Sequence, residues 1–156
     1  MYNIRRKLLS QNFLYNRKLV EQLVERSSIG KHDLVVEIGP GKGIITHSLI
    51  KKAGHVIAVE LDAHWYRHIQ HIFAEVDNLT LYQADILSHP LPRLPYKVFA
   101  NIPFAIEGKV IRKLLDDQNP PQDCYLVVMR ELAYRLVLQS GSMFSAMYAP
   151  WFEFSI

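Results

Sequence analysis

Short apolar segments that alternate with helical patterns constrain the fold of this chain more than any other feature. Val, Ile and Leu dominate five of these segments, at residues 34–38, 56–59, 79–82, 97–100 and 125–129. Such segments are typical of strands that are buried on both faces. Strands that alternate with helices predict an α/β fold, in which a parallel sheet carries helices on both of its faces.

Amphipathic helices are predicted around these strands, because apolar residues recur there at the three- and four-residue spacing of one helix face. The residues concerned are Leu19, Val20, Leu23 and Val24; Ile45, Leu49 and Ile50; Trp65, Ile69, Ile72, Phe73 and Val76; and Val110, Ile111, Leu114 and Leu115. Three prolines within residues 90–95 predict a loop instead, since proline fixes the backbone and removes a donor.

The last residues of the chain, 151–156, alternate like a strand, with Phe152, Phe154 and Ile156 on one face. The length of 156 residues suffices for one domain with a hydrophobic core. Because the chain stops within this predicted strand, we expect residues 1–156 to form a single domain that is incomplete at its C-terminal end.

Composition excludes several classes of protein. No apolar run approaches the ~20 residues that span a bilayer, and the basic start lacks the apolar stretch of a signal peptide. The single cysteine, Cys124, rules out an internal disulfide and fits a reducing cytoplasm. The net charge of +3 permits a nucleic-acid partner without requiring one.

Polar or glycine-rich residues follow four of the predicted strands. They are residues 37–43, Glu60, Asp85 and residues 101–104. Ligands of open α/β sheets bind beyond the carboxyl ends of the strands, so these four segments predict one binding cleft.

The glycine-rich segment, residues 37–43, follows a strand and opens a helix. Gly39, Gly41 and Gly43 allow a tight turn and the close approach of a ligand. Their GxGxG spacing differs from the GxGxxG of dinucleotide-binding folds, which favours an adenosyl ligand over a pyrophosphate. The structural alternative is a turn without a ligand.

Two acids complete the predicted cofactor side of the cleft. Glu60 can accept hydrogen bonds from both hydroxyls of a ribose, and Asp85 can accept one from the amino group of an adenine. The alternatives are a solvated acid at a strand end for Glu60 and a turn residue for Asp85. We assign neighbouring Asp62 as a helix N-cap.

Residues 101–104, Asn-Ile-Pro-Phe, place a polar residue and a proline directly after a buried strand. The proline can fix a turn that directs the Asn101 amide oxygen and the Ile102 carbonyl into the cleft. An exocyclic amine could donate to both acceptors while its ring stacks on Phe104. The alternative is a strand-terminating turn with Phe104 in the core.

Taken together, these segments are similar to the rRNA adenine N6-methyltransferases in order and rough spacing. The segments are residues 11–14, 37–43, Glu60, 84–87 and 101–104. Ile102, Phe104 and residues 110–114 resemble the erythromycin-resistance (Erm) branch of that group. The housekeeping small-subunit rRNA dimethyltransferases usually have Leu and Tyr in place of Ile102 and Phe104.

This resemblance implies a Rossmann-like enzyme that transfers a methyl group from S-adenosylmethionine to one single-stranded adenine of 23S rRNA, which confers macrolide, lincosamide and streptogramin B resistance. It implies catalytic roles for Asn101, Ile102 and Phe104. The implied cofactor-binding residues are Gln11, Asn12, Leu14, Glu37, Gly39, Gly41, Gly43, Glu60, Leu61, Asp85, Ile86 and Asn101. We expect a cytoplasmic monomer without a metal.

The sequence departs from the family at two places. Ala105 and Glu107 stand where the family often has Asn and a hydroxyl residue, and the family's further strand and C-terminal helical domain are missing. The alternatives are therefore a housekeeping small-subunit dimethyltransferase or a catalytically weak RNA-binding fragment. An NAD-dependent oxidoreductase is disfavoured by the GxGxG spacing.

Two basic clusters are candidates for contacts with RNA phosphates, or else are ordinary solvated surface. They are Arg5, Arg6 and Lys7, and Arg112 and Lys113. His64, His68 and His71 share one predicted helix, but no acidic partner or third ligand accompanies the His64/His68 pair at a strand end, so we expect no metal.

Overall fold

The computed structural model describes residues 14–138 and 143–156, and within them a five-stranded sheet. All four strand pairs are parallel, and the spatial order is β3-β2-β1-β4-β5. The strands are β1 (Leu34–Ile38), β2 (His55–Glu60), β3 (Leu79–Gln83), β4 (Lys97–Asn101) and β5 (Cys124–Val127). The predicted α/β class and the positions of all five predicted strands are therefore confirmed, with ends that differ by at most two residues. The prediction that all five are buried is wrong for β3 and β5, which lie at the two edges of the sheet and are only partly buried.

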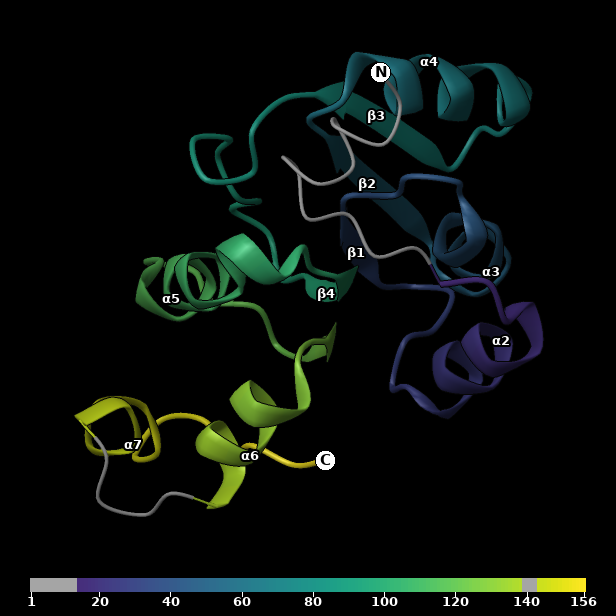
Figure 1. Cartoon of the computed structure of the whole chain (residues 1–156). Helices are drawn as coiled ribbons and strands as arrows, with labels where there is room; N and C mark the ends of the chain where they lie inside the picture. Colours follow the sequence, from purple (N-terminus) through teal and green to yellow (C-terminus); the bar gives the residue numbers. More distant parts are fainter. Residues whose placement is uncertain (1–13, 139–142) are drawn as a thin grey trace.

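Helices cover both faces of the sheet, as expected for parallel strands. Figure 1 shows α2 and α3 on one side of the sheet and α5 on the other. The helices are α2 (Arg17–Arg26), α3 (Ile44–Lys52), α4 (Ala63–Ile72), α5 (Glu107–Asp116), α6 (Arg130–Leu138) and α7 (Met143–Tyr148), with a 3₁₀ turn, η1 (Phe104–Ile106), before α5. The proline-rich loop, residues 90–95, is irregular as predicted.

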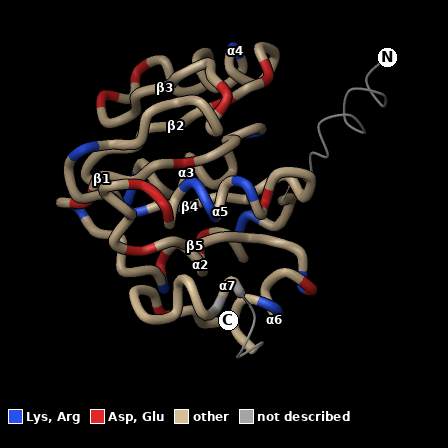
Figure 2. Tube along the Cα trace, turned by 90° about the vertical axis from the view of Figure 1, so that its left-hand side faces the viewer, with Lys and Arg blue, Asp and Glu red and all other residues tan. Residues whose placement is uncertain are grey.

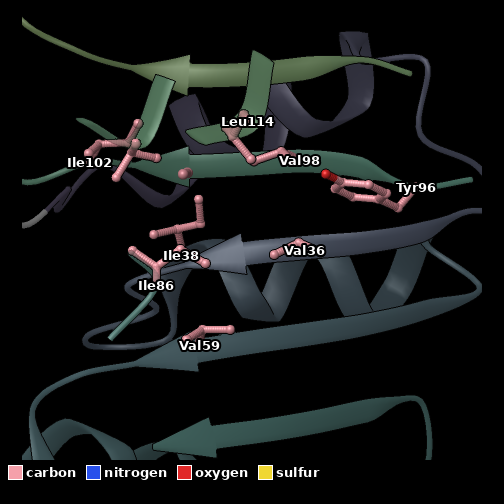
Figure 3. Packing of buried hydrophobic residues seen from close by; sticks show 10 residues of the cluster. Val36, Ile38, Val59, Ile86, Tyr96, Val98, Ile102 and Leu114 are labelled. Atoms are coloured by element: carbon pink, nitrogen blue, oxygen red, sulfur yellow. The ribbon is translucent and has the colours of Figure 1, made fainter. Parts of the chain in front are cut away.

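Two buried clusters form the core, one on each face of the sheet. Val36 and Val98 point toward Leu114 of α5 (Figure 3), while Val35 packs with Leu49 of α3 on the opposite face. Successive side chains of a strand point to opposite faces, so each central strand contributes to both clusters. This explains why these strands are almost continuously apolar in sequence.

The order of the strands creates a crevice between β1 and β4. The chain runs from β1 outward through β2 to β3, and then returns to the other side of β1 to form β4. The connections that leave the carboxyl ends of β1 and β4 therefore diverge, which is the arrangement that opens a ligand site in doubly wound sheets.

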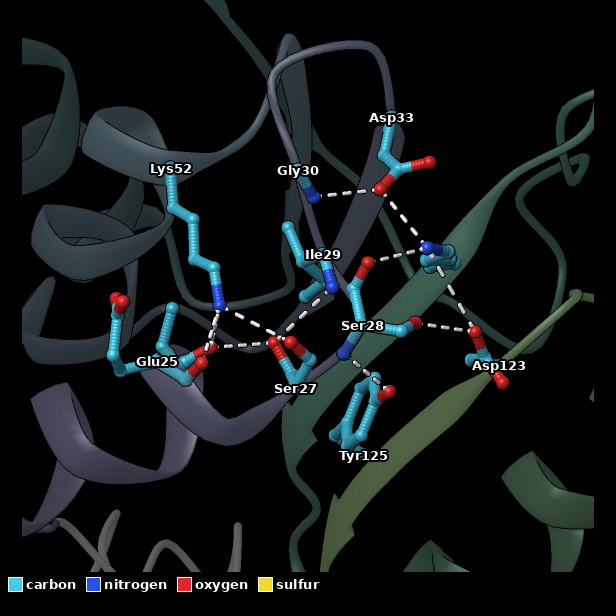
Figure 4. A network of polar contacts seen from close by, with 11 residues as sticks. Glu25, Ser27, Ser28, Ile29, Gly30, Asp33, Lys52, Asp123 and Tyr125 are labelled. Atoms are coloured by element: carbon cyan, nitrogen blue, oxygen red, sulfur yellow. Dashed lines mark hydrogen bonds and ion pairs between the residues drawn. The ribbon is translucent and has the colours of Figure 1, made fainter.

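Polar contacts tie the helices to the opposite edge of the sheet, where the strands begin (Figure 4). Lys52 donates to three backbone carbonyls at the end of α2, at 2.6, 2.7 and 3.1 Å. Lys97, at the start of β4, donates to the Ser28 carbonyl at 2.7 Å and to Asp33 Oδ2 at 2.9 Å. These contacts fill the side of the sheet where the strands begin. The side that is left for a ligand is the one at the carboxyl ends of the strands.

Two predicted elements differ from the structure. Helix α4 ends at Ile72, so Phe73 and Val76 fall outside it; Phe73 is its C-cap, and the chain then turns to begin β3. The predicted strand at residues 151–156 is wrong, because these residues have no regular structure. The backbone N–H groups of Trp151 and Phe152 instead bond to the carbonyl of Tyr148, at the end of α7. Alternation alone cannot form a strand without a hydrogen-bonding partner strand.

Candidate functional site

A pocket of about 190 Å³ lies at the carboxyl ends of the strands. Its walls come from the segments after β1, β2, β3 and β4, together with Leu14 from the approach to α2. The sequence-predicted residues that line it are Leu14, Gly39, Gly41, Glu60, Leu61, Asp85, Ile86 and Asn101. Residues that are separated by up to 87 positions along the chain thus meet in one cavity, as the four strand ends predict.

The three glycines after β1 all have positive φ, but they do different work. A Cβ on Gly39 would meet nothing within 4 Å, so this position leaves open space at the pocket wall. A Cβ on Gly43 would lie 2.9 Å from side-chain atoms of Ile69 and Phe73. Gly43 therefore lets α4 pack closely against the start of α3, and it does not line the pocket.

Glu60 is held in a fixed orientation by the backbone. It is only 3 % exposed, and its Oε2 accepts from the N–H of Gly41 at 3.0 Å while Oε1 accepts from the N–H of Asp62 at 2.8 Å. Burial raises the pKa of this carboxyl, and the backbone N–H groups oppose that shift. Each carboxylate oxygen has two lone pairs, so Glu60 can accept further hydrogen bonds from a ligand.

Glu37 lies beneath the pocket and does not line it. Its side chain is fully buried on the α3 face of the sheet, and neither oxygen has a hydrogen bond of normal geometry within the described residues. Contacts with Thr46 offset only part of the effect of this burial on the pKa of Glu37. Burial raises the pKa of Glu37 to about 8, so the carboxyl is mostly protonated at neutral pH.

Asp85 forms a turn and also lies in the lining of the pocket. Its Oδ1 accepts from the N–H of Leu87 at 2.9 Å, which forms a turn, and the residue also lines the pocket. Leu61 and Ile86 add apolar surface beside it, one largely exposed and the other buried. Asp62 caps α4 as predicted, by accepting from the N–H of His64.

The loop after β4 presents its residues in three ways. Asn101 lines the pocket, and Pro103 lies beside it. Ile102 is 1 % exposed, so its side chain belongs to the core, and its N–H donates to the carbonyl of Val127. Phe104 is 39 % exposed and lies outside the pocket lining. An exposed aromatic ring next to the pocket fits a stacking surface better than the core position of the alternative hypothesis.

Sequence reasoning missed two charged residues at this edge. Lys42 lines the pocket from within the glycine segment. Glu107, noted only as a departure from the family, is 2 % exposed and its Oε1 accepts from the N–H of Met129 at 2.7 Å. Glu107 thereby joins the start of α5 to the start of α6. The lysine between two glycines was a signal that could have been used, whereas the contact of Glu107 spans 22 residues.

Other predicted residues lie elsewhere. Gln11, Asn12 and the cluster Arg5, Arg6 and Lys7 lie outside the described residues. On α5, Arg112 is exposed, and Lys113 donates to the carbonyl of Leu87 at 3.2 Å. Figure 2 shows Lys and Arg interspersed with Asp and Glu along the described trace.

Within the described residues, no group of three or more His, Cys, Asp or Glu residues could hold a metal ion. The ring of Trp65 lies against His64 and His68, at centroid distances of 4.9 and 5.5 Å. No helix in this part of the chain is long and apolar enough to cross a membrane.

Comparison with known proteins finds relatives of the chain. The family model for ribosomal RNA adenine dimethylase matches residues 2–155. The chain is 35 % identical over 148 residues to ribosomal RNA small subunit methyltransferase A of Dehalococcoides mccartyi. This match covers 91 % of this chain and 51 % of the relative. It is 38 % identical over 142 residues to a protein of Methanopyrus kandleri named probable ribosomal RNA small subunit methyltransferase A. That match covers 90 % of this chain and 50 % of the relative. The chain thus spans about half the length of these curated relatives.

Solved structures give a consistent result. The 23S rRNA methyltransferase ErmE matches with a TM-score of 0.82 and 25 % identity, over 91 % of this chain and 59 % of that one. A dimethyladenosine transferase from Plasmodium falciparum matches with a TM-score of 0.74 and 26 % identity, over 84 % and 48 %. An S-adenosylmethionine-dependent O-methyltransferase from Thermotoga maritima, at 14 % identity, a TM-score of 0.60 and coverage of 72 % and 44 %, shares the fold alone.

Proposed function

The chain belongs to the ribosomal RNA adenine dimethylase family, and on this premise we propose that it is the cofactor-binding part of an rRNA adenine N6-methyltransferase that uses S-adenosylmethionine. The pocket at the carboxyl ends of the strands supports this proposal. It brings together the glycine turn, Glu60 as an acceptor for a ribose, Asp85 as an acceptor for an adenine, and the amide of Asn101. We further propose that the protein meets its rRNA in the cytoplasm.

The described residues fit an adenosyl ligand. Glu60 is fixed by two backbone N–H groups and retains acceptor capacity for two ribose hydroxyls. Asp85 can accept from the adenine amino group, and Leu61 and Ile86 supply apolar surface for the ring. Gly39 leaves the space that the rest of the cofactor needs. When bound, the cofactor supplies a methyl group on a positively charged sulfur, which is a strong electrophile.

The loop after β4 would prepare the target amine for attack. The lone pair of an adenine N6 is delocalised into the ring, which makes it a poor nucleophile. The Asn101 amide oxygen and the Ile102 carbonyl are two acceptors that can draw the amine toward a pyramidal geometry and localise that pair. The exposed ring of Phe104 can stack on the base.

Positioning would then supply much of the rate enhancement. In-line alignment of two reactants can lower a barrier by ~7–11 kcal/mol in favourable cases. No general base is needed before attack, since the methylated amine is acidic and can lose its proton to water. The base must leave its stack to enter the pocket, which favours a single-stranded adenine.

We propose small-subunit rRNA as the first target to test. Both curated relatives are named as small-subunit methyltransferases, and both exceed 30 % identity over most of this chain. A 23S rRNA target of the Erm type, with antibiotic resistance as its consequence, is the second candidate. The match to ErmE and the residues Ile102 and Phe104 favour it.

Binding of S-adenosylhomocysteine, measured by calorimetry, is the first test of the proposal. We expect saturable binding that weakens at least tenfold in Glu60→Ala, because that variant loses the buried acceptor for the ribose. Lys51→Met, at the exposed far end of α3, is the matched control and should bind normally. A folded wild-type chain that binds no S-adenosylhomocysteine would refute the proposal.

A methyl-transfer assay separates the two targets. The chain and tritiated S-adenosylmethionine would be incubated in parallel with unmethylated small and large ribosomal subunits. Label in the small-subunit rRNA that is lost in Asn101→Ala is the expected result, and label in 23S rRNA would favour the second candidate instead. Cofactor binding with no label in either rRNA would leave an RNA-binding fragment as the better description.

A further inference from the structure

Charge is distributed unevenly around the pocket. Two carboxyl groups, those of Glu60 and Asp85, lie at the ends of β2 and β3. Among the described residues that line the pocket, Lys42 provides the one basic side chain. It belongs to the loop after β1, and it lies beside Tyr15, which precedes α2. The two acids and Lys42 thus belong to different walls of the same cavity.

The Lys42 ammonium is held near this wall by an aromatic ring. Lys42 Nζ lies 4.6 Å from the centroid of the Tyr15 ring, a cation–π contact. Lys42 is half-buried, whereas Tyr15 is 63 % exposed. Helix α3 starts two residues later, at Ile44, which also lines the pocket. The N–H groups of its first turn add positive potential at the same place. This wall of the pocket therefore favours an anion.

The ligand of the proposed function has one anionic group. Its adenosine part offers hydroxyl and amino donors, which suit the two acids. Its amino-acid part ends in an α-carboxylate, which is the group that an ammonium binds best. A ligand placed with its ribose at Glu60 and its adenine at Asp85 directs the other end away from β2 and β3. Of the charged residues in the described lining of the pocket, Lys42 is the one whose charge is opposite to that of the carboxylate.

We propose that Lys42 binds the α-carboxylate of the cofactor's amino-acid part and makes the pocket select ligands that carry that carboxylate. This inference rests on the proposed function and adds to it a residue outside the predicted set. It implies that S-adenosylhomocysteine binds partly through Lys42, whereas 5′-methylthioadenosine, which has the same adenosine and sulfur but no amino-acid carboxylate, does not.

Calorimetry with these two ligands tests the inference without any measurement of activity. Lys42→Met removes the charge but keeps most of the stem, Lys42→Arg keeps the charge, and Lys51→Met is the control on the same loop–helix unit. We expect Lys42→Met to weaken S-adenosylhomocysteine about tenfold or more and to leave 5′-methylthioadenosine within about twofold. Lys42→Arg should retain most of the affinity. Circular dichroism verifies the fold of each variant.

Each other outcome overturns a defined statement. Equal weakening of both ligands means that Lys42 shapes the pocket instead of binding the carboxylate. Unchanged affinity for both ligands excludes Lys42 from cofactor binding, and a loss of RNA affinity in that same variant would assign it to a phosphate instead. If the folded wild-type chain binds neither ligand, the proposed function itself fails, and the inference fails with it.

Discussion

The centre of the sheet and the C-terminal quarter of the molecule differ in how deeply their residues are buried. In the centre, β1 and β4 are buried along almost their whole length, and helices α2, α3 and α5 cover both faces. In the C-terminal quarter, β5 is only partly buried, and α6 has no buried residue in its described span. The described residues that line the pocket all belong to the central side. The edge that carries the pocket therefore adjoins the well-buried centre of the sheet, whereas the described C-terminal region contributes few residues to the core.

The largest effect is expected from a pair of leucine truncations, one in each region. Leu114→Ala removes a 1 %-exposed side chain from the cluster between α5 and β4, and should cost about 2–5 kcal/mol of unfolding free energy because a cavity remains. Leu138→Ala, at a position that is 64 % exposed in α6, should change it by less than about 0.5 kcal/mol. Urea unfolding measures both. Equal losses would show that the two regions share one core.

The next test measures how stability depends on pH, which for the central region is set by the buried carboxyl of Glu37. The carboxyl of Glu37 ionises near 4.5 in the unfolded chain and has a pKa of about 8 in the folded one. Its stabilising contribution is thus complete below about pH 4.5 and is lost as the pH rises through 8. Glu37→Gln cannot ionise, so its stability should rise relative to wild type by a few kcal/mol between pH 5 and 8.5. Parallel curves for the two proteins over this range would contradict the assignment.

Glycine substitutions test the packing of the loop after β1. Gly43→Ala should cost about 1–3 kcal/mol, because φ is +78° and the new Cβ would lie 2.9 Å from Ile69 and Phe73. Gly108→Ala, in α5 on the way to the C-terminal quarter, meets nothing within 4 Å and should stabilise by up to about 1 kcal/mol. Thermal unfolding compares them. A harmless Gly43→Ala would show that α4 can move away from α3.

The smallest expected effect concerns the attachment of the C-terminal quarter. The hydroxyl of Tyr148 in α7 donates to Asp116 Oδ1 at 2.6 Å, which ties α7 to the end of α5. Tyr148→Phe should cost about 0.5–1.5 kcal/mol and speed hydrogen exchange in α7. Affinity for S-adenosylhomocysteine should not change, because the pocket lies at the other region. A drop in that affinity would mean that the two regions are coupled.

The pattern of sequence predictions follows the same division. The central strands β1 and β4 were predictable because a strand buried on both faces needs a continuous apolar run, a requirement that is visible locally. The edge strands β3 and β5 were predicted at the right positions, although they are only partly buried. The strand predicted at residues 151–156 failed because alternation is only permissive, and the backbone there bonds to the end of α7. Helix α4 stopped at Ile72, short of its apolar pattern, because the chain has to turn toward β3.

Within the site, the sequence by itself determined which strand ends carry polar chemistry, and hence that Gly39, Glu60, Asp85 and Asn101 would meet at one edge. Strand alternation and residue type suffice for that, since parallel strands place their carboxyl ends together. Only the tertiary structure decided which of these residues line the pocket and which pack against neighbouring helices. It separated Gly39, which opens the pocket, from Gly43, which accommodates α4. These outcomes depend on contacts with distant residues, which no local pattern encodes.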